Sequence, residues 1–358
     1  MLHTPYTAED FSINPLMFYY ETTRACDLVC KHCRAEAQHD PHPDELTHEQ
    51  SLALIRQAAQ FPRKPNICFT GGDPLKRADI FELIELARSL DITAALTPSA
   101  TPLATYDAFK RAKQAGVHAI GISLDGADAP MHDAFRGWEG SFEKTQAMLS
   151  YAKELNLPVQ VNTSLCQRNF GQLDQIAQLL KDKQIAMWSV FFLVPVGRGT
   201  EEPRLTPDQY RVAFDKLHKY SLTMPYGVKT TEAPHYRRFV LEQGDNPLAP
   251  PKAGHGGRGK AYAAPLGVTD GRGIMFIGHN GEIYPAGFLP LCCGRFTQDS
   301  VIDVYQNHPT FVALHNPDNY KGKCGACKYR FQCGGSRARA FAVTGDPLET
   351  EPDCFYED

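Results

Sequence analysis

Residues 26–33 read CDLVCKHC, a segment in which Cys26, Cys30 and Cys33 stand at Cx3Cx2C spacing. Four cysteines would complete a zinc site or ligate every iron of a cubane iron–sulfur cluster. Three cysteines hold three irons and leave the fourth iron open to a distant residue or a small molecule. A cluster needs an open iron if it is to perform chemistry, so this segment predicts a reactive cluster.

The cysteine content of the whole chain helps to distinguish metal binding from disulfide formation. Eleven cysteines in 358 residues would suit a secreted disulfide protein, but the length, the tight spacings and the lack of a signal peptide argue against it. Clustered cysteines in a reducing compartment more often bind metal. A zinc knuckle is the alternative at the first cluster, and it would need His32 or His39 as its fourth ligand. Cys68 and Cys166 lie in predicted strands and are expected to be small core residues.

Composition and charge favour a soluble enzyme. The chain is 42% hydrophobic and 22% charged, with a net charge of −4 and a pI of about 6.4. We expect neither a nucleic-acid partner nor a membrane surface, because attraction to phosphates needs a concentrated basic surface. The longest apolar run, VFFLVPV (190–196), is too short to span a bilayer, and we expect a cytoplasmic protein.

Strand and helix patterns alternate along most of the chain. Helical patterns separate the predicted strands; the first helix, over 46–61, is capped by Thr47, and Gly116 is a predicted C-cap. Six such repeats predict an α/β fold, a partial (β/α)6 TIM-like barrel, with a doubly wound sheet as the alternative. The predicted strands are 17–23, 66–70, 92–97, 119–123, 158–164 and 187–194.

The unusual residues all follow predicted strands. Because active sites of such barrels lie where the strands end, these segments are expected to converge on one rim. They are the three cysteines, GGDP (71–74), TPS (97–99), SLDG (123–126), Asn162 and VPVGRG (194–199).

The run ACDLVCKHC (25–33) resembles the signature of the radical S-adenosylmethionine (SAM) superfamily, with His32 where an aromatic residue is more usual. The resemblance covers roughly residues 15–355. It implies a [4Fe-4S] cluster on the three cysteines, whose open iron is chelated by the amino and carboxylate groups of S-adenosyl-L-methionine. Reduction then releases a 5′-deoxyadenosyl radical, and the electron comes from a reductase such as flavodoxin or ferredoxin.

The resemblance also implies cofactor-binding residues on the rim. GGDP is similar to the family's GGEP motif, with Asp73 in place of glutamate. Arginine suits a carboxylate because it pairs through two parallel hydrogen bonds. The alternatives are that Ser123 only caps a strand end and that Arg136 forms a surface ion pair. The implied residues are Gly71, Gly72, Asp73, Pro74, Thr97, Ser99, Ser123, Arg136 and Asn162.

A second cysteine set has Cx2Cx5Cx20C spacing, which by itself suits zinc as well as a cluster. The run from KCGAC (323–327) to Cys354 resembles the auxiliary-cluster module of SPASM/Twitch-type radical SAM enzymes and implies a second [4Fe-4S] cluster. We expect one auxiliary cluster, because Ala286 stands where the peptide-maturing branch usually has a cysteine. Neither ligation nor a structural role can be chosen for Cys292 and Cys293. The set comprises Cys324, Cys327, Cys333 and Cys354.

These patterns divide the chain into three predicted segments. They are a radical SAM partial barrel (14–221), a linker or loop region (222–270) and a small iron–sulfur auxiliary domain (271–358). The glycines of 247–267 resemble a phosphate-cradling loop, but they neither follow a strand nor open a clear helix, so a flexible loop is favoured.

CGGSRARA (333–340) and GEIYPAGFLP (281–290) are most similar to the tetrapyrrole-modifying branch, such as the alternative haem synthase. This branch implies a small-molecule substrate, a tetrapyrrole whose side chains are modified by decarboxylation or acetate removal in haem-type biosynthesis. The alternative is a peptide or protein maturase that forms thioether or carbon–carbon crosslinks. His235, Arg237, Arg238 and Arg258 are substrate candidates, because histidine can ligate iron and arginine can hold propionates; ordinary loop residues are an equal alternative.

Overall fold

The computed structural model describes residues 6–7, 9–248 and 265–357. Its centre is one sheet in the order β10-β9-β8-β1-β2-β3-β4-β5-β6-β7. Strands β1 to β7 are parallel neighbours in chain order, which is the arrangement of an α/β barrel and confirms the predicted fold class. The parallel strands are β1 (Met17–Glu21), β2 (Asn66–Thr70), β3 (Ala94–Leu96), β4 (Ala119–Ser123), β5 (Val159–Leu165), β6 (Met187–Phe192) and β7 (Gly227–Thr231).

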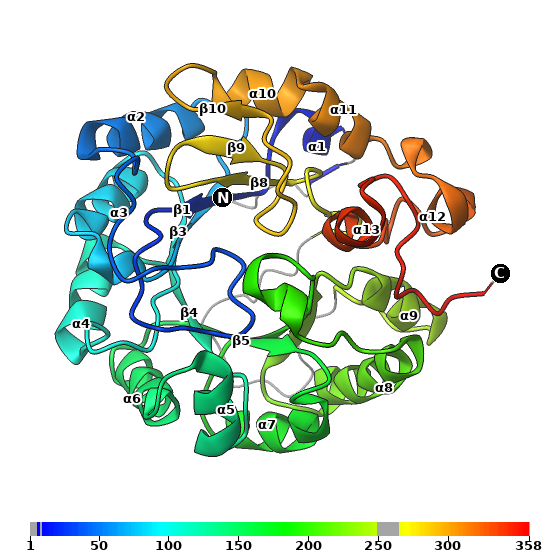
Figure 1. The fold of residues 1–358 in the computed structure, drawn as a ribbon, viewed down its shortest axis with the longest axis horizontal. Helices are drawn as coiled ribbons and strands as arrows, with labels where there is room; N and C mark the ends of the chain where they lie inside the picture. Colours follow the sequence, from blue (N-terminus) through cyan, green and yellow to red (C-terminus); the bar gives the residue numbers. More distant parts are fainter. Residues whose placement is uncertain (1–5, 8, 249–264, 358) are drawn as a thin grey trace.

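Helices surround this sheet as a ring (Figure 1). Thr47 caps α2 through a capping box with Gln50, and Gly116 ends α4 at φ 104°, as predicted. The helices between the strands are α2 (His48–Ala58), α3 (Ile80–Ser89), α4 (Tyr106–Ala115), α5 (Ala129–Arg136), α6 (Ser141–Glu154), α7 (Leu173–Leu180) and α8 (Pro207–Thr223).

The two faces of the strands differ in character. One face packs against the helices in a large apolar core that includes Phe18, Phe69 and Trp188. Because side chains alternate along a strand, the neighbouring residues point into the interior of the barrel. That inner face is here called the lumen. On β5 it carries the half-buried Gln160, Asn162 and Ser164, which alternate strictly with buried residues.

The sheet extends beyond the six predicted strands. β7 and α9 (His235–Glu242) lie inside the segment expected to be a linker. The sequence GVKTT is short and polar, so its pattern did not predict a strand, but it pairs with β6 along its length. β8 (Ile274–Ile277) pairs in parallel with β1, so the expected auxiliary segment contributes to the barrel sheet. The three-segment division stays a prediction.

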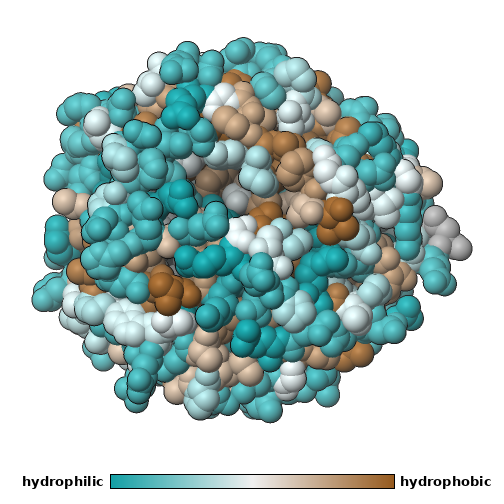
Figure 2. Space-filling view, in the orientation of Figure 1, coloured by the Kyte–Doolittle hydropathy of each residue, from teal (hydrophilic) through white to brown (hydrophobic). Residues whose placement is uncertain are grey.

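The rest of the C-terminal segment packs beside the barrel (Figure 1, orange to red). On this face hydrophobic side chains gather near the centre, inside a more hydrophilic rim (Figure 2). Within the described ranges, no helix is long and apolar enough to cross a membrane. The remaining elements are α1 (Asp10–Ile13), β9 (Glu282–Tyr284), β10 (Gly294–Arg295), α10 (Val301–Asn307), α11 (Pro309–His315), α12 (Gly322–Ala326) and α13 (Arg337–Thr344).

Candidate active site

The first cysteine segment forms the loop between β1 and α2, and each of its thiols receives an N–H donor. The amide of Leu28 points to Cys26 Sγ at 3.4 Å, the amide of Ala37 to Cys33 Sγ at 3.4 Å, and Arg136 Nη1 to Cys30 Sγ at 3.7 Å. Burial raises the pKa of the Cys26 thiol to about 11. A bound metal would favour the thiolate form of this sulfur.

The GGDP turn lies directly under this loop because its glycines have no side chains. A Cβ on Gly71 would lie 2.4 Å from Thr23 O, and a Cβ on Gly72 would lie 2.4 Å from Ala25 O. The amides of Gly72 and Asp73 donate to these same two carbonyls, at 2.8 and 2.7 Å. These amides are engaged within the protein, so only carbonyl oxygens remain for a cofactor amine.

The fully buried carboxylate of Asp73 accepts hydrogen bonds from two loops. Its Oδ1 accepts from the amides of Leu75 and Ser99, at 3.1 and 3.3 Å, and its Oδ2 accepts from Thr101 Oγ1 at 2.6 Å. Pro74 is buried at the start of the following turn. The Asp73 side chain is thus committed to the loop after β3, and only its backbone is left to meet a cofactor.

The remaining predicted rim residues lie on neighbouring strand ends. Ser99 Oγ donates to Gly72 O at 2.8 Å and accepts a weak hydrogen bond from Cys26 Sγ at 3.6 Å. Ser123 and Asn162 are register partners on β4 and β5, and both are half-buried. Thr97 follows β3, with its Oγ1 3.4 Å from Cys68 Sγ.

Asp125 is a site residue that the sequence analysis missed, although it lies within the SLDG run. It is fully buried, 2.7 Å from Arg136 Nε and 3.5 Å from His32 Nε2. Burial opposes its ionisation, but the Arg136 charge, the neighbouring histidines and the hydrogen bond from the Ser164 amide together outweigh burial and lower the Asp125 pKa. Arg136 therefore forms a buried ion pair beside a cluster thiol, and the surface ion pair considered as an alternative is wrong.

The VPVGRG segment holds the cysteine loop from the opposite side. Arg198 Nε donates to Cys30 O at 2.9 Å, and its backbone amide donates to Cys33 O at 3.1 Å. Gly197 has φ 54°, and a Cβ there would meet Cys33 O at 2.6 Å. This arrangement explains why a glycine precedes the arginine.

Two cations face the lumen. Lys229 on β7 is half-buried and has no hydrogen-bond or ion-pair partner among the described residues. Burial, with the nearby charge of Arg237, lowers its pKa to about 8. Arg237 donates to Val268 O at 2.9 Å, and burial lowers its pKa to about 10. Lys229 stands in a short polar strand, and the sequence analysis did not single it out.

The second cysteine set converges although it spans 31 residues (324–354): all four cysteines line one cavity. N–H donors surround their sulfurs. Glu351 N and Arg337 Nη2 point to Cys324 Sγ at 3.2 and 3.4 Å, Tyr329 N to Cys327 Sγ at 3.4 Å, and Gly335 N to Cys333 Sγ at 3.4 Å. Four thiols with such donors fit the ligation of a cluster.

His235 lies at this cavity, not in the lumen, together with Arg238. Its ring packs against the rings of Tyr210 and Phe214, and its role as a ligand to a substrate iron stays a prediction. Arg258 lies outside the described residues.

Neither cysteine set has the arrangement of ligands around a single metal ion. Within the described residues no group of three or more His, Cys, Asp or Glu side chains is placed to hold one metal ion. A cubane makes no such demand, because each thiolate ligates a different iron. The chemistry of the donor sets fits a cluster of this kind at both places. Cys68 and Cys166 are buried, as predicted, while Cys292 is exposed.

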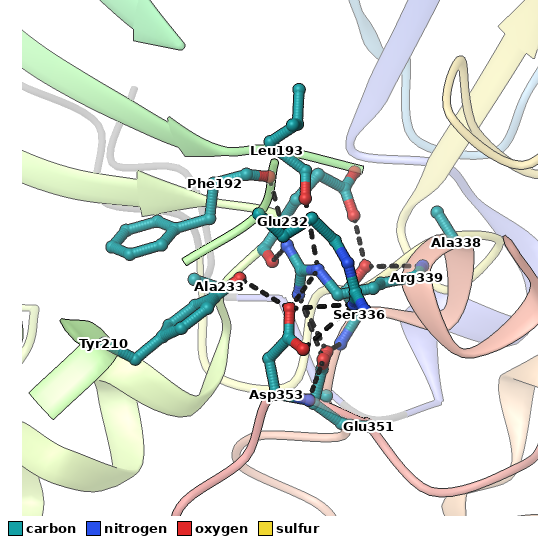
Figure 3. Close-up of polar contacts among 12 residues, drawn as sticks. Phe192, Leu193, Tyr210, Glu232, Ala233, Ser336, Ala338, Arg339, Glu351 and Asp353 are labelled. Carbon is teal, nitrogen blue, oxygen red and sulfur yellow. Dashed lines mark hydrogen bonds and ion pairs between the residues drawn. The ribbon is translucent and has the colours of Figure 1, made fainter. Parts of the chain in front are cut away.

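A fully buried arginine joins the second cysteine region to the barrel (Figure 3). From α13, Arg339 Nη2 donates to Phe192 O at 3.0 Å and to Glu232 O at 2.7 Å, and Nε donates to Leu193 O at 3.3 Å. These carbonyls lie at the ends of β6 and β7. Arg339 of the CGGSRARA run thus connects the second cysteine region to the barrel.

The fold and the cysteine loop define a class of enzyme. The Radical SAM superfamily model matches residues 20–180. Together with the full-length relatives below, this match shows that the chain belongs to the radical SAM superfamily and is a radical SAM enzyme.

Curated relatives confirm the predicted resemblance to the tetrapyrrole-modifying branch. An AdoMet-dependent heme synthase of Oleidesulfovibrio alaskensis is 35% identical, with 99% of this chain and 91% of the relative covered. An AdoMet-dependent heme synthase of Methanosarcina barkeri is 33% identical, with coverage of 96% and 97%. Among solved structures, SuiB of Streptococcus suis has a TM-score of 0.72 at 16% identity, covering 96% of this chain and 78% of SuiB. That likeness supports the fold.

Proposed function

We propose that this enzyme generates a 5′-deoxyadenosyl radical from SAM at a [4Fe-4S] cluster held by Cys26, Cys30 and Cys33. We further propose that the radical modifies tetrapyrrole side chains, with oxidative decarboxylation of propionates favoured. The observation that carries this proposal is 35% identity to a heme synthase along 99% of the chain. When bound, the cluster would supply the electron that cleaves the sulfonium of SAM.

The protein's own groups position the reactants. Backbone carbonyls at GGDP would accept hydrogen bonds from a cofactor amine, and the Asp125–Arg136 pair sets a guanidinium beside the cluster loop. Ser123 and Asn162 lie side by side on β4 and β5 and would contact the ribose. Oriented groups of this kind lower the entropic cost of reaction.

The lumen suits a substrate that carries carboxylates. Lys229 and Arg237 are two neighbouring, desolvated cations, and an anionic ligand would offset the cost of burying them. Propionate side chains supply such anions. Lys229 therefore joins Arg237 as a proposed substrate-binding residue.

Decarboxylation of a propionate to a vinyl group balances as follows. The radical takes one hydrogen atom from the side chain, the carbon–carbon bond to the carboxylate breaks, carbon dioxide leaves, and one electron remains. We propose that a second [4Fe-4S] cluster, on Cys324, Cys327, Cys333 and Cys354, accepts that electron. A flavodoxin or ferredoxin is the proposed donor for the first cluster.

Anaerobic turnover tests this proposal. Reconstituted protein is incubated with SAM, dithionite and a panel of iron and metal-free tetrapyrroles and short peptides, and products are read by mass spectrometry. We expect a tetrapyrrole to lose carbon dioxide and two hydrogens per modified propionate, in step with 5′-deoxyadenosine. A crosslinked peptide with unchanged tetrapyrroles would favour the maturase instead.

The matched control is C26A/C30A/C33A. This variant should form no 5′-deoxyadenosine while keeping the second cluster visible. Normal SAM cleavage in the triple variant would overturn the assignment of the first cysteines.

A further inference from the structure

His235 has an unusual environment for a buried histidine. Its side chain is 0% exposed, and neither Nδ1 nor Nε2 has a hydrogen-bond partner among the described residues. An imidazole has at least one N–H in either protonation state, and an unpaired buried donor costs about 1–3 kcal/mol.

Aromatic rings pack around the imidazole, and the cavity is the side that remains open to its N–H. The Tyr210, Phe214 and Phe355 rings lie 5.2, 4.9 and 6.3 Å from the imidazole centroid. The remaining side is the cavity lined by the four cysteines. The other polar groups there are largely engaged: the Glu351 carboxylate accepts from Arg339 and Ser336.

Arg238 is a second buried donor at this cavity. Its Nη1 forms an ion pair with Glu242 and its guanidinium lies 4.4 Å from the ring centroid of Tyr356, while Nε and Nη2 have no hydrogen-bond partner among the described residues. The ion pair offsets part of the Arg238 charge without any occupant of the cavity, whereas neither ring nitrogen of His235 has a partner.

We propose that His235 donates its N–H to a sulfur of the cluster bound by Cys324, Cys327, Cys333 and Cys354. The hydrogen bond would raise the reduction potential of that cluster. Hydrogen bonds to cluster sulfurs stabilise the more negative, reduced form. A higher potential suits a cluster that accepts an electron from substrate. The inference rests on the proposed auxiliary cluster and not on the identity of the substrate.

The test uses the C26A/C30A/C33A background, in which the auxiliary cluster is the only cluster expected. H235F removes the donor and keeps an aromatic ring. The control is H315F, because His315 is also a buried histidine with an unpartnered Nε2 but does not line the cavity. Potentiometric titrations are followed by electron paramagnetic resonance, with iron and sulfide measured for each variant.

We expect H235F to shift the midpoint potential to a more negative value than that of the parent or H315F, with unchanged iron content. H235N or H235Q, which offer an amide N–H near the two ring nitrogen positions, should restore it. An unchanged midpoint in H235F would overturn the proposal. Loss of iron from folded H235F would also overturn it, since His235 would then be a ligand. A parent with no second cluster would instead refute the proposed auxiliary cluster.

Discussion

Nη1 of Arg339 lies 3.1 Å from both carboxylate oxygens of Glu351, and neither side chain is exposed beyond 1%. Asp353 adds a third charge, with Oδ2 3.2 Å from Arg339 Nε. The same guanidinium also reaches carbonyls at the strand ends of the barrel (Figure 3). This ion pair thus links the segment that carries Cys354 to the rim that carries the active site.

Replacing Arg339 by Met should lower the free energy of unfolding by about 3–5 kcal/mol, because removal of one partner leaves a buried charge uncompensated. Urea unfolding measures this change. The control is R330M, which removes the exposed ion pair of Arg330 with Asp318 and should cost about 1 kcal/mol or less. Equal losses in the two variants would contradict the assigned role.

The Glu351 carboxylate should also make stability depend on acid pH. Burial opposes its ionisation, but the charges of Arg339 and Arg337 together with the hydrogen bond from the Ser336 amide outweigh burial and lower the Glu351 pKa. A carboxylate with a lowered folded pKa stabilises the protein above its unfolded pKa, about 4.3, and that contribution is lost as pH falls through the folded value. Unfolding free energies between pH 7 and about 3 should therefore fall less steeply in E351Q. Parallel curves for E351Q and the parent would argue against this linkage.

Substituting Gly72 should damage the first cluster selectively. In G72A the new Cβ would lie 2.4 Å from Ala25 O, a backbone atom of the cysteine loop that cannot move freely. We expect loss of iron equal to one cluster and loss of 5′-deoxyadenosine formation. G171A is the control, because a Cβ there meets nothing within 4 Å. Full iron content in G72A would contradict this prediction, because the cysteine loop would then have shifted to accommodate the new Cβ.

Neutralising Asp125 should weaken SAM binding. D125N removes the carboxylate that compensates the Arg136 guanidinium, which lies beside Cys30. We expect the Kd for SAM to rise at least tenfold, equivalent to about 1.4 kcal/mol, as measured by equilibrium binding to the reconstituted protein. D346N, which removes a surface ion pair with Lys321, should leave the Kd unchanged. An unaltered Kd in D125N would place Arg136 outside the cofactor site.

The lumen lysine offers a test of the substrate class. K229M keeps the chain length but removes the charge, so a propionate-bearing porphyrin should bind about tenfold or more weakly while SAM binding is unchanged. Fluorescence quenching measures porphyrin binding without turnover. K216M, which alters a surface pair with Asp174, is the control. Equal porphyrin affinities would remove Lys229 from the substrate site.

The sequence by itself determined the order of the first six parallel strands, the three-cysteine loop and the rim motifs. These depend on local information: the spacing of Cys26, Cys30 and Cys33, the alternation of strands and helices, and glycines at tight approaches. The GGDP turn was placed correctly because only glycine tolerates the contact with Thr23 and Ala25.

Only the tertiary structure decided which residues far apart in the chain share a site. Asp125 meets His32 across 93 residues, and Arg339 meets Leu193 across 146. β8 joins β1 although a predicted domain boundary separates them, and His235 turns toward the second cysteine set instead of the lumen. Spacing along the chain carries no signal for such contacts, because they arise from closure of the sheet and packing of its loops, which bring buried charges and donors to partners that neighbouring residues do not specify.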